Sequence, residues 1–518
     1  MKLYRGFATV GAMTILSRVL GFARDVLIAA VLGTSFVADA FFVAFRVPNM
    51  FRRLFAEGAF DAAFIPLFAR RMHEDGLAAA RAFAGQALSG LTVLLVAVVI
   101  LGEIAMPWFM LLLAPGFHED AEKFALAVLL ARIALPYLVC MSLVALYTGV
   151  LNAQGRFAVA AFTPSLLNIV LIIVLLGLVA TGNTDKGQAG MALAWGIVLS
   201  GLLQVVVIAV AAARTSMHLP LTRPRLTPDM SRLVALAVPG MVAGGIGQLT
   251  GVISTIIATL QDRVVSWLYY AERIVQLPLG VIGVAVGVVL LPDLSHKLRT
   301  GDHRAVIRSE NRALEFALLL TLPAAAALIL AATPIMRVLF QHGAFTAADT
   351  DATSAILSAL ALGLPAYVII KVLHPSFFAR EDTRTPMIFA AVSMGANVVL
   401  SLILFLAIGG TGIAVAAMLS GWINVALLVM ALKRRGEFAL DAAFRRAILG
   451  IVAATVCMSV AVYGLERMLD PYLVPSRSLA AQVAALFALV AGGLLVYAVS
   501  AQVFGAAKFR ELIKELRP

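Results

Sequence analysis

The chain has 518 residues, of which 62% are hydrophobic and only 13% are charged, and its mean hydropathy is +0.99. A soluble domain carries about 25% charged residues, so this composition excludes a soluble globular protein and indicates a polytopic membrane protein. The net charge of +12 is expected to come from basic loops that set the membrane topology, and no nucleic-acid partner is expected.

Fourteen segments are long and apolar enough to cross a bilayer core of about 30 Å as helices. In chain order they are 6–33, 36–60, 84–114, 122–151, 157–181, 187–213, 230–259, 264–295, 312–340, 352–378, 386–408, 411–432, 446–466 and 479–505. The first is interpreted as a retained helix, because charged residues interrupt what would be the apolar core of a signal peptide. The second is the least hydrophobic, but the loop charges stop alternating without it.

Basic residues alternate from loop to loop along the chain. The N-terminus and every second loop are rich in Lys and Arg, whereas the intervening loops hold only Lys186, Arg263, Arg467 and Arg477. Because positive residues mark the cytoplasmic ends of membrane helices, both termini are predicted to be cytoplasmic. This placement requires an even number of crossings, and fourteen satisfies it.

The sequence also contains an internal repeat. Residues 42–46 (FVAFR) resemble 269–273 (YYAER), and 64–66 (FIP) resemble 290–292 (LLP), with further short matches in the same order. The predicted architecture is all-α, with two six-helix lobes related by a pseudo-two-fold axis along the membrane normal, plus two C-terminal helices. This is typical of transporters in which two lobes rock about a central site. The predicted parts are residues 1–213, 214–432 and 433–518.

Six arginines fall within the apolar segments. They are Arg18, Arg24, Arg46, Arg52, Arg53 and Arg273. An arginine at mid-bilayer costs about 2.5–3.5 kcal/mol on insertion scales, and such residues almost always face a bundle interior or a water-filled cavity. A guanidinium stays ionised and offers a planar fork of donors for a phosphate. The sequence therefore predicts a cavity that accepts a phosphate or pyrophosphate.

Carboxylates accompany these arginines. They are Asp25, Asp39, Glu57, Asp61 and Glu272. Neighbours in a helix, such as Arg24 and Asp25, point about 100° apart and are not expected to pair through adjacency alone. The alternative interpretation is that acids and arginines neutralise one another across helices and serve packing. The excess of arginine at the deepest positions favours the anion site.

Other deep polar residues carry less specific information. Glu103 lies on the third predicted segment, Arg132 on the fourth, and Lys371 and His374 on the tenth, as cavity groups or locally paired residues. The histidines show no metal-ligand spacing, no Gly-rich phosphate loop follows a strand, and the two cysteines lie in apolar stretches. We therefore expect no enzymatic activity, no cofactor and no metal site.

The motifs that contain the arginines are long and specific. They read SRVLGFARD at 17–25, DAFFVAFRVPN at 39–49, RRLFAEGAF at 52–60 and WLYYAER at 267–273. In these motifs the chain resembles the MurJ (MviN) family of lipid II flippases, within the multidrug/oligosaccharidyl-lipid/polysaccharide exporter superfamily. The likeness extends over nearly the whole chain, and it implies two six-helix lobes with a groove for a polyprenyl tail on the last two helices.

The resemblance implies a substrate and residue roles. The substrate would be the undecaprenyl-pyrophosphate-linked peptidoglycan precursor, lipid II, moved from the inner to the outer leaflet of the bacterial inner membrane. Arg18, Arg24 and Arg273 would hold the pyrophosphate, Arg52 would assist at the cytoplasmic side, and Asp39 would act at the outer gate. From the residues themselves, and not from the resemblance, supporting or gating roles are expected for Asp25, Arg46, Arg53, Glu57 and Glu272. Membrane lipids and cell-wall synthesis proteins are the other expected partners.

Three alternatives stay open. A flippase for another polyprenyl-pyrophosphate-linked glycan would suit the arginines equally, an antiporter for cationic drugs would need surplus deep carboxylate, and a non-transporting scaffold would tolerate loss of the arginines. In some family members, acidic residues on helices 7 and 11 form a pattern that resembles a sodium-binding site. Here the seventh segment has no acid and the eleventh carries Asn397 and Ser401, which argues against sodium coupling.

Overall fold

The computed structural model describes residues 2–55, 59–182, 185–215, 217–225, 227–299 and 303–506. The chain divides into two compact units, Met1–Ser266 (unit 1) and Trp267–Pro518 (unit 2). Across the described ranges the regular structure is helical and no strand is present, which confirms the predicted all-α class.

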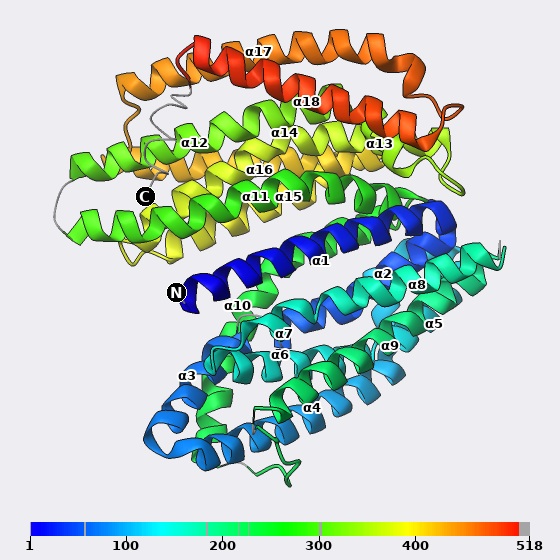
Figure 1. Ribbon diagram of the computed structural model, residues 1–518, viewed down its shortest axis with the longest axis vertical. Helices are drawn as coiled ribbons and strands as arrows, with labels where there is room; N and C mark the ends of the chain where they lie inside the picture. The colour runs from blue at the N-terminus through cyan, green and yellow to red at the C-terminus, as the bar shows by residue number, and fades with distance from the viewer. Residues whose placement is uncertain are drawn as a thin grey trace. The chain divides into compact units, whose positions relative to one another are not determined.

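The described residues of unit 1 form ten α-helices, a short 3₁₀ helix and the first turn of an eleventh α-helix (Figure 1). They are α1 (Lys2–Leu32), α2 (Phe36–Phe55), α3 (Ala59–Glu74), α4 (Gly76–Leu113), η1 (Pro115–Glu119), α5 (Ala121–Ala134), α6 (Tyr137–Ala153), α7 (Phe157–Phe162), α8 (Ser165–Ala180), α9 (Lys186–Ala213), α10 (Pro228–Ala258) and α11 (Val264–Arg299). α1 packs against α7 and α8, α9 packs against α5, α6 and α8, and α10 packs against α2, α3 and α4.

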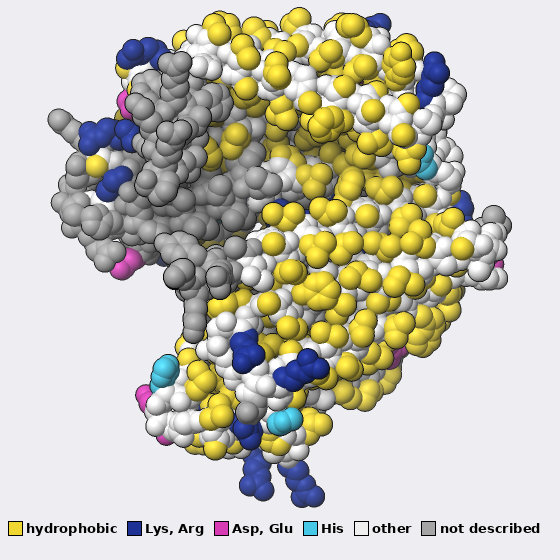
Figure 2. All heavy atoms as spheres, in the orientation of Figure 1, with side chains coloured by type: hydrophobic (Ala, Val, Ile, Leu, Met, Phe, Trp, Pro, Cys, Tyr) yellow, Lys and Arg dark blue, Asp and Glu magenta, His cyan; other side chains and the backbone are white. Residues whose placement is uncertain are grey.

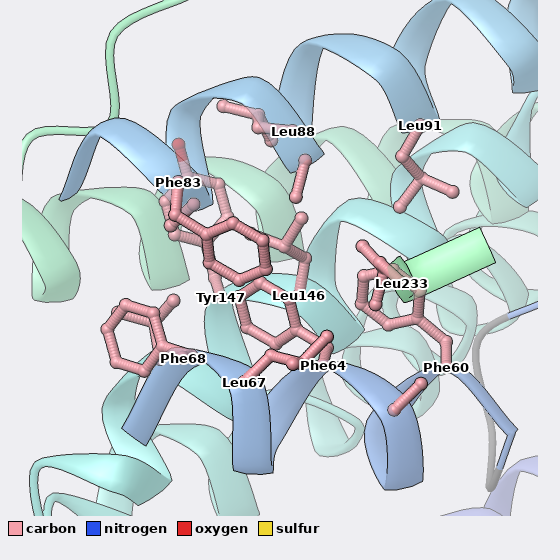
Figure 3. Packing of buried hydrophobic residues seen from close by; sticks show 14 of the residues in the cluster. Phe60, Phe64, Leu67, Phe68, Phe83, Leu88, Leu91, Leu146, Tyr147 and Leu233 are labelled. Carbon is pink, nitrogen blue, oxygen red and sulfur yellow. The ribbon is translucent and has the colours of Figure 1, made fainter. Parts of the chain in front are cut away.

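An aromatic cluster forms the core between α3, α4, α6 and α10 (Figure 3). Phe64 stacks on Phe60, Phe68 and Phe83, with ring centroids 5.3–5.7 Å apart. Leu233 brings α10 into the same core. Each such buried side chain contributes roughly 1.5–3 kcal/mol, so this cluster fixes α3 and α10 to the rest of unit 1.

In the described part of unit 2 the chain forms most of α11 and seven further α-helices. They are α12 (His303–Leu330), α13 (Ala332–Phe340), α14 (Ala347–Phe378), α15 (Arg384–Ile408), α16 (Gly410–Arg434), α17 (Ala442–Leu469) and α18 (Leu479–Val503), with the 3₁₀ helix η2 (Asp470–Tyr472). α14 packs between α12 and α16, and α17 and α18 lie side by side against α12 (Figure 1). The Tyr497 hydroxyl of α18 donates to the backbone oxygen of Leu319 at 2.6 Å.

Ten helical stretches among the described residues are long and apolar enough to cross a membrane, so the chain is a multi-pass membrane protein. Large hydrophobic side chains such as Leu406 and Phe487 are 88% and 73% exposed. Figure 2 shows hydrophobic side chains covering the visible face of α17 and α18, with Lys and Arg gathered near helix ends. The count of fourteen crossings stays a prediction.

Several helices differ in extent from the predicted segments. The expected fourth segment is broken at Leu135 and Pro136 between α5 and α6, and the ninth at Ala331 between α12 and α13. α4 begins at Gly76 and α12 at His303, both earlier than expected, and α3 was not expected as a separate helix. Helical turns beyond the apolar core leave no trace in hydropathy, which explains the longer ends.

The boundary between the two units lies inside α11 and places α10 in unit 1. The predicted division groups this helix with the following segments. The three-part division into 1–213, 214–432 and 433–518 and the two-fold relation between its first two parts stay predictions.

Candidate functional site

Arg24 on α1 lies in a buried polar cluster with Asp25 and with Asn168 of α8. Its Nη2 and Nε atoms donate to Asp25 Oδ1 at 2.7 and 3.0 Å, and its Nη1 donates to Asn168 Oδ1 at 3.0 Å. Asn168 donates in turn to the backbone oxygen of Ser17 at 3.0 Å. Arg24 is 4% exposed and Asp25 is fully buried, so the two charges compensate each other within unit 1.

Adjacency alone does not make an ion pair of Arg24 and Asp25, but the side-chain conformation of Arg24 does. The long arginine side chain curls back so that two of its nitrogens share one carboxylate oxygen. Asn168 fixes the third nitrogen, and this residue gave no signal in the sequence because a single amide in an apolar helix is common. The result is a guanidinium held in one orientation.

A second buried cluster surrounds Asp39, near the start of α2. Lys123 of α5 donates to Asp39 Oδ2 at 3.3 Å and to Asp262 Oδ1 at 2.7 Å. The backbone N–H of Arg263 donates to Asp39 Oδ2 at 2.8 Å, and the hydroxyl and backbone N–H of Ser266 donate to Oδ1 at 2.6 and 3.0 Å. One carboxylate thus ties α2 and α5 to the turn between α10 and α11.

Close backbone contacts reinforce this tie. Arg263 has a left-handed φ of 69°, a conformation that residues other than glycine adopt rarely. At Gly116, just before α5, an added Cβ would lie 2.1 Å from the backbone oxygen of Thr259, so only glycine allows the approach. The end of α10 and the start of α11 are therefore held against the neighbouring turns of unit 1.

Sequence reasoning missed Lys123, which is 2% exposed and lies 4.3 Å from the centre of the Phe117 ring. Lys123 lies at the start of a predicted helix, where a charged residue is common and does not indicate a buried site. One signal could have found it: it is a basic residue on the side of the membrane where such residues are otherwise few.

Of the other predicted arginines of unit 1, the structure describes the side chains of Arg18 and Arg46. Arg18 is exposed on α1, six residues before Arg24. Arg46 of α2 is half-buried and faces α10, where an added Cβ at Gly251 would lie 3.1 Å from Arg46 Nη2. The side chains of Arg52 and Arg53, and the whole of Glu57, lie outside the described residues.

Arg273 and Glu272 lie on the part of α11 that belongs to unit 2, and both are half-buried. Arg273 Nη1 donates to Gln276 Oε1 at 3.4 Å, and its guanidinium carbon lies 5.7 Å from the centre of the Tyr269 ring. Trp267, the first residue of α11 in unit 2, donates through its indole Nε1 to Asp349 Oδ1 of α14 at 3.2 Å. These contacts orient Arg273 from its own helix and anchor that helix to α14.

The other four deep polar residues have different surroundings. Arg132 of α5 donates to the backbone oxygen of Glu103 on α4 at 3.0 Å, and the two side chains form an ion pair at 3.9 Å. This pair is locally satisfied, as one of the two interpretations expected. In unit 2, Lys371 is exposed, and the His374 ring lies 5.6 Å from that of Phe378.

Comparisons with known proteins match this chain to lipid II flippases. A family model described as lipid II flippase MurJ matches residues 28–484. A probable lipid II flippase MurJ of Rhizobium meliloti (strain 1021) is 43% identical over 518 residues, covering 100% of this chain and 97% of the relative. That of Rhizobium tropici is 41% identical, covering 100% and 98%.

Solved structures give the same result at the level of fold. A lipid II flippase MurJ in an inward closed conformation matches with a TM-score of 0.76 and 27% identity, covering 97% of this chain and 99% of that one. An inward-facing multidrug resistance MATE transporter matches with a TM-score of 0.67 at 14% identity, over 83% and 97%. The second likeness shows only a shared fold, but the first accompanies the full-length sequence match. The chain belongs to the MurJ family of lipid II flippases.

Proposed function

We propose that this protein moves lipid II from the inner to the outer leaflet of the bacterial inner membrane by alternating access. The observation that carries the proposal is the match to flippases of this family over the whole chain, including 43% identity to a relative of equal extent. Both termini would lie in the cytoplasm, with fourteen crossings between them.

We assign recognition of the pyrophosphate to the arginines. Arg18 is exposed on α1, Arg24 is held rigidly six residues further along, and Arg273 is oriented by Gln276 and Tyr269. A guanidinium binds phosphate oxygens through two parallel hydrogen bonds and remains charged in an apolar setting. In this structure Arg24 is 4% exposed and is bonded to Asp25 and Asn168, so the assignment of Arg24 rests on the family resemblance.

Supporting roles follow from the remaining predicted residues. Asp39 would close the outer side, because its carboxylate gathers the starts of α2, α5 and α11 in unit 1. Arg52 would assist at the cytoplasmic side, with Arg46, Arg53, Glu57 and Glu272 as gating or supporting groups. α17 and α18 would bind the polyprenyl tail.

The test is the accessibility of lipid II at the outer leaflet of spheroplasts, measured with an externally added probe after rapid depletion of this protein. Depletion should abolish access while total lipid II rises, and the parent chain should restore it. Arg273→Ala should insert and fold but fail to restore access, whereas Arg477→Ala, on an exposed turn, should behave as the parent.

Each outcome bears on a different part of the proposal. Unchanged access after depletion would refute lipid II flipping and favour another polyprenyl-pyrophosphate-linked glycan or a scaffold role. Full rescue by Arg273→Ala would leave the flippase function intact and refute the arginine as a pyrophosphate ligand.

A further inference from the structure

A groove in unit 1 lies apart from the two charged clusters. It is a cavity of about 280 Å³ between α3, α4, α10 and the segment 217–225 that leads into α10. Its floor is buried and apolar, with Leu91 and Leu233 only 9% and 4% exposed, whereas Leu94 and Val234 at its rim are 51% and 47% exposed. An open apolar groove on a membrane helix is a surface for a hydrocarbon chain.

The polar groups of this groove gather at one end. Arg225 and Gln86 line it there, and Thr227 Oγ1 donates to Gln86 Oε1 at 3.2 Å. The Thr222 N–H donates to Ser89 Oγ at 2.9 Å, which fastens the segment 217–225 along α4. Arg225 therefore lies on a segment that is fixed to α4, at the open end of an apolar groove.

The length of the groove matches one leaflet. Its lining on α10 extends from Met230 to Val238, which at 1.5 Å per residue is about 12 Å along the helix. Half of a hydrocarbon core of about 30 Å is about 15 Å. The groove begins two residues after the start of α10, where the chain enters the apolar region. A chain lying in it would run from the membrane surface towards the midplane.

We propose that this groove binds one acyl chain of an anionic phospholipid, with the lipid phosphate at Arg225. A guanidinium pairs well with a phosphate, and anionic lipids are attracted to basic groups at the membrane surface. Among the described residues the carboxylate of Asp229 pairs with Arg71, which Asp75 shares, and Arg225 forms no ion pair. The small volume suits an acyl chain better than a long polyprenyl tail. The proposal concerns unit 1 alone and does not depend on the flippase function.

The experiment uses the full chain carrying Val234→Trp in nanodiscs that contain phospholipids brominated on the acyl chain. Bromine quenches nearby tryptophan, and the signal of the four native tryptophans is measured in the parent chain and subtracted. We expect brominated phosphatidylglycerol to quench the introduced tryptophan with about fivefold higher apparent affinity than brominated phosphatidylcholine. A ratio of about this size is expected from the attraction of one arginine to an anionic headgroup.

Two further variants make the result decisive. Arg225→Gln should bring the ratio of the two affinities close to one, whereas Arg223→Gln, also exposed but outside the groove, should leave it unchanged. Gly90→Leu should fill the groove and reduce quenching by both lipids, and a Cβ there is tolerated because its nearest neighbour is Met230 Cε at 3.6 Å. Equal affinity for the two lipids, or a preference that survives Arg225→Gln, would overturn the proposal. So would quenching that Gly90→Leu leaves unchanged.

Discussion

Buried charges in the described part of unit 1 lie against opposite charges. Arg24 pairs with Asp25, and Lys123 bridges Asp39 and Asp262. Breaking such a pair from one side leaves a charge in an apolar interior, which costs far more than the intact pair contributes. Loss of one member therefore affects both stability and function, and the two effects have to be measured separately.

We expect Asp25→Asn to destabilise the protein strongly, because the buried Arg24 guanidinium would lose the carboxylate that compensates its charge. Removing one member of a buried ion pair costs about 3–5 kcal/mol. Glu74→Gln is the matched control, since its carboxylate is 64% exposed and 3.9 Å from Arg70 Nε; such surface changes stay within about 0.5 kcal/mol. Thermal unfolding of the purified proteins in one detergent gives the comparison. Similar midpoints for the two variants would contradict the prediction.

The Asp39 cluster is suited to a double-mutant cycle. Asp39→Asn and Lys123→Met each remove one charge of a pair whose nitrogen and oxygen are 3.3 Å apart. Groups in one network show coupling energies of about 0.5–3 kcal/mol, so the double variant should be more stable than the sum of the two single effects predicts. Chemical denaturation of the four proteins measures this coupling, and additive losses would show that Lys123 does not stabilise Asp39.

The sequence pointed to charged residues but not to their partners. Arg24 and Asp39 stand out because charge is rare in apolar segments, and both lie in buried clusters in the structure. Asn168 and Ser266 carry no such signal, because single polar residues are common in membrane helices. Which arginine is neutralised and which is exposed depends on side-chain conformation and on residues distant in the chain, and a single sequence contains neither.

At the level of elements, hydropathy located the helices but not their breaks. The same Leu-Pro pair occurs at 135–136 and 364–365, yet Pro136 separates α5 from α6 whereas Pro365 lies inside the continuous α14. Proline removes one backbone donor and disfavours the preceding turn, but packing of the neighbouring helices decides whether the helix continues. The sequence motif alone could not distinguish these outcomes.

The turn between α14 and α15 supplies a prediction about pH. The backbone N–H and the side chain of Thr385, together with the Arg435 guanidinium at 2.8 Å, lower the pKa of Asp382 to about 2. Since the pKa in the unfolded chain is about 3.9, the ionised carboxylate stabilises the fold above about pH 4, and this contribution disappears as the pH falls towards 2.

The parent should therefore melt above Asp382→Asn by a constant margin from about pH 7 to 5, and the margin should narrow below about pH 4. Thermal unfolding in detergent across this pH range measures it. Because the group is close to the surface, added salt should also reduce the margin. A margin that is the same at pH 3 and pH 7 would contradict the role of the ionised carboxylate.

At the scale of the whole molecule, the alternation of basic residues makes a prediction about orientation. Exposed basic residues at 223 and 434 belong to the rich loops, whereas Lys186 and Arg477 belong to the poor ones. If the rich loops are cytoplasmic, single cysteines at these four positions should divide into two groups by accessibility. Each unit then contributes one position to each side, so the orientation of both units is tested together.

In spheroplasts, a membrane-impermeant maleimide should label Lys186→Cys and Arg477→Cys, and it should label Arg223→Cys and Arg434→Cys only after permeabilisation. The parent chain sets the background, since Cys140 is buried and Cys457 half-buried. Labelling of all four before permeabilisation would show leaky membranes, which a cytoplasmic marker protein detects. The reversed pattern in intact spheroplasts would invert the topology and place the mouth of the Arg225 groove at the outer leaflet. A pattern reversed in one unit alone would instead refute an even number of crossings between 223 and 434.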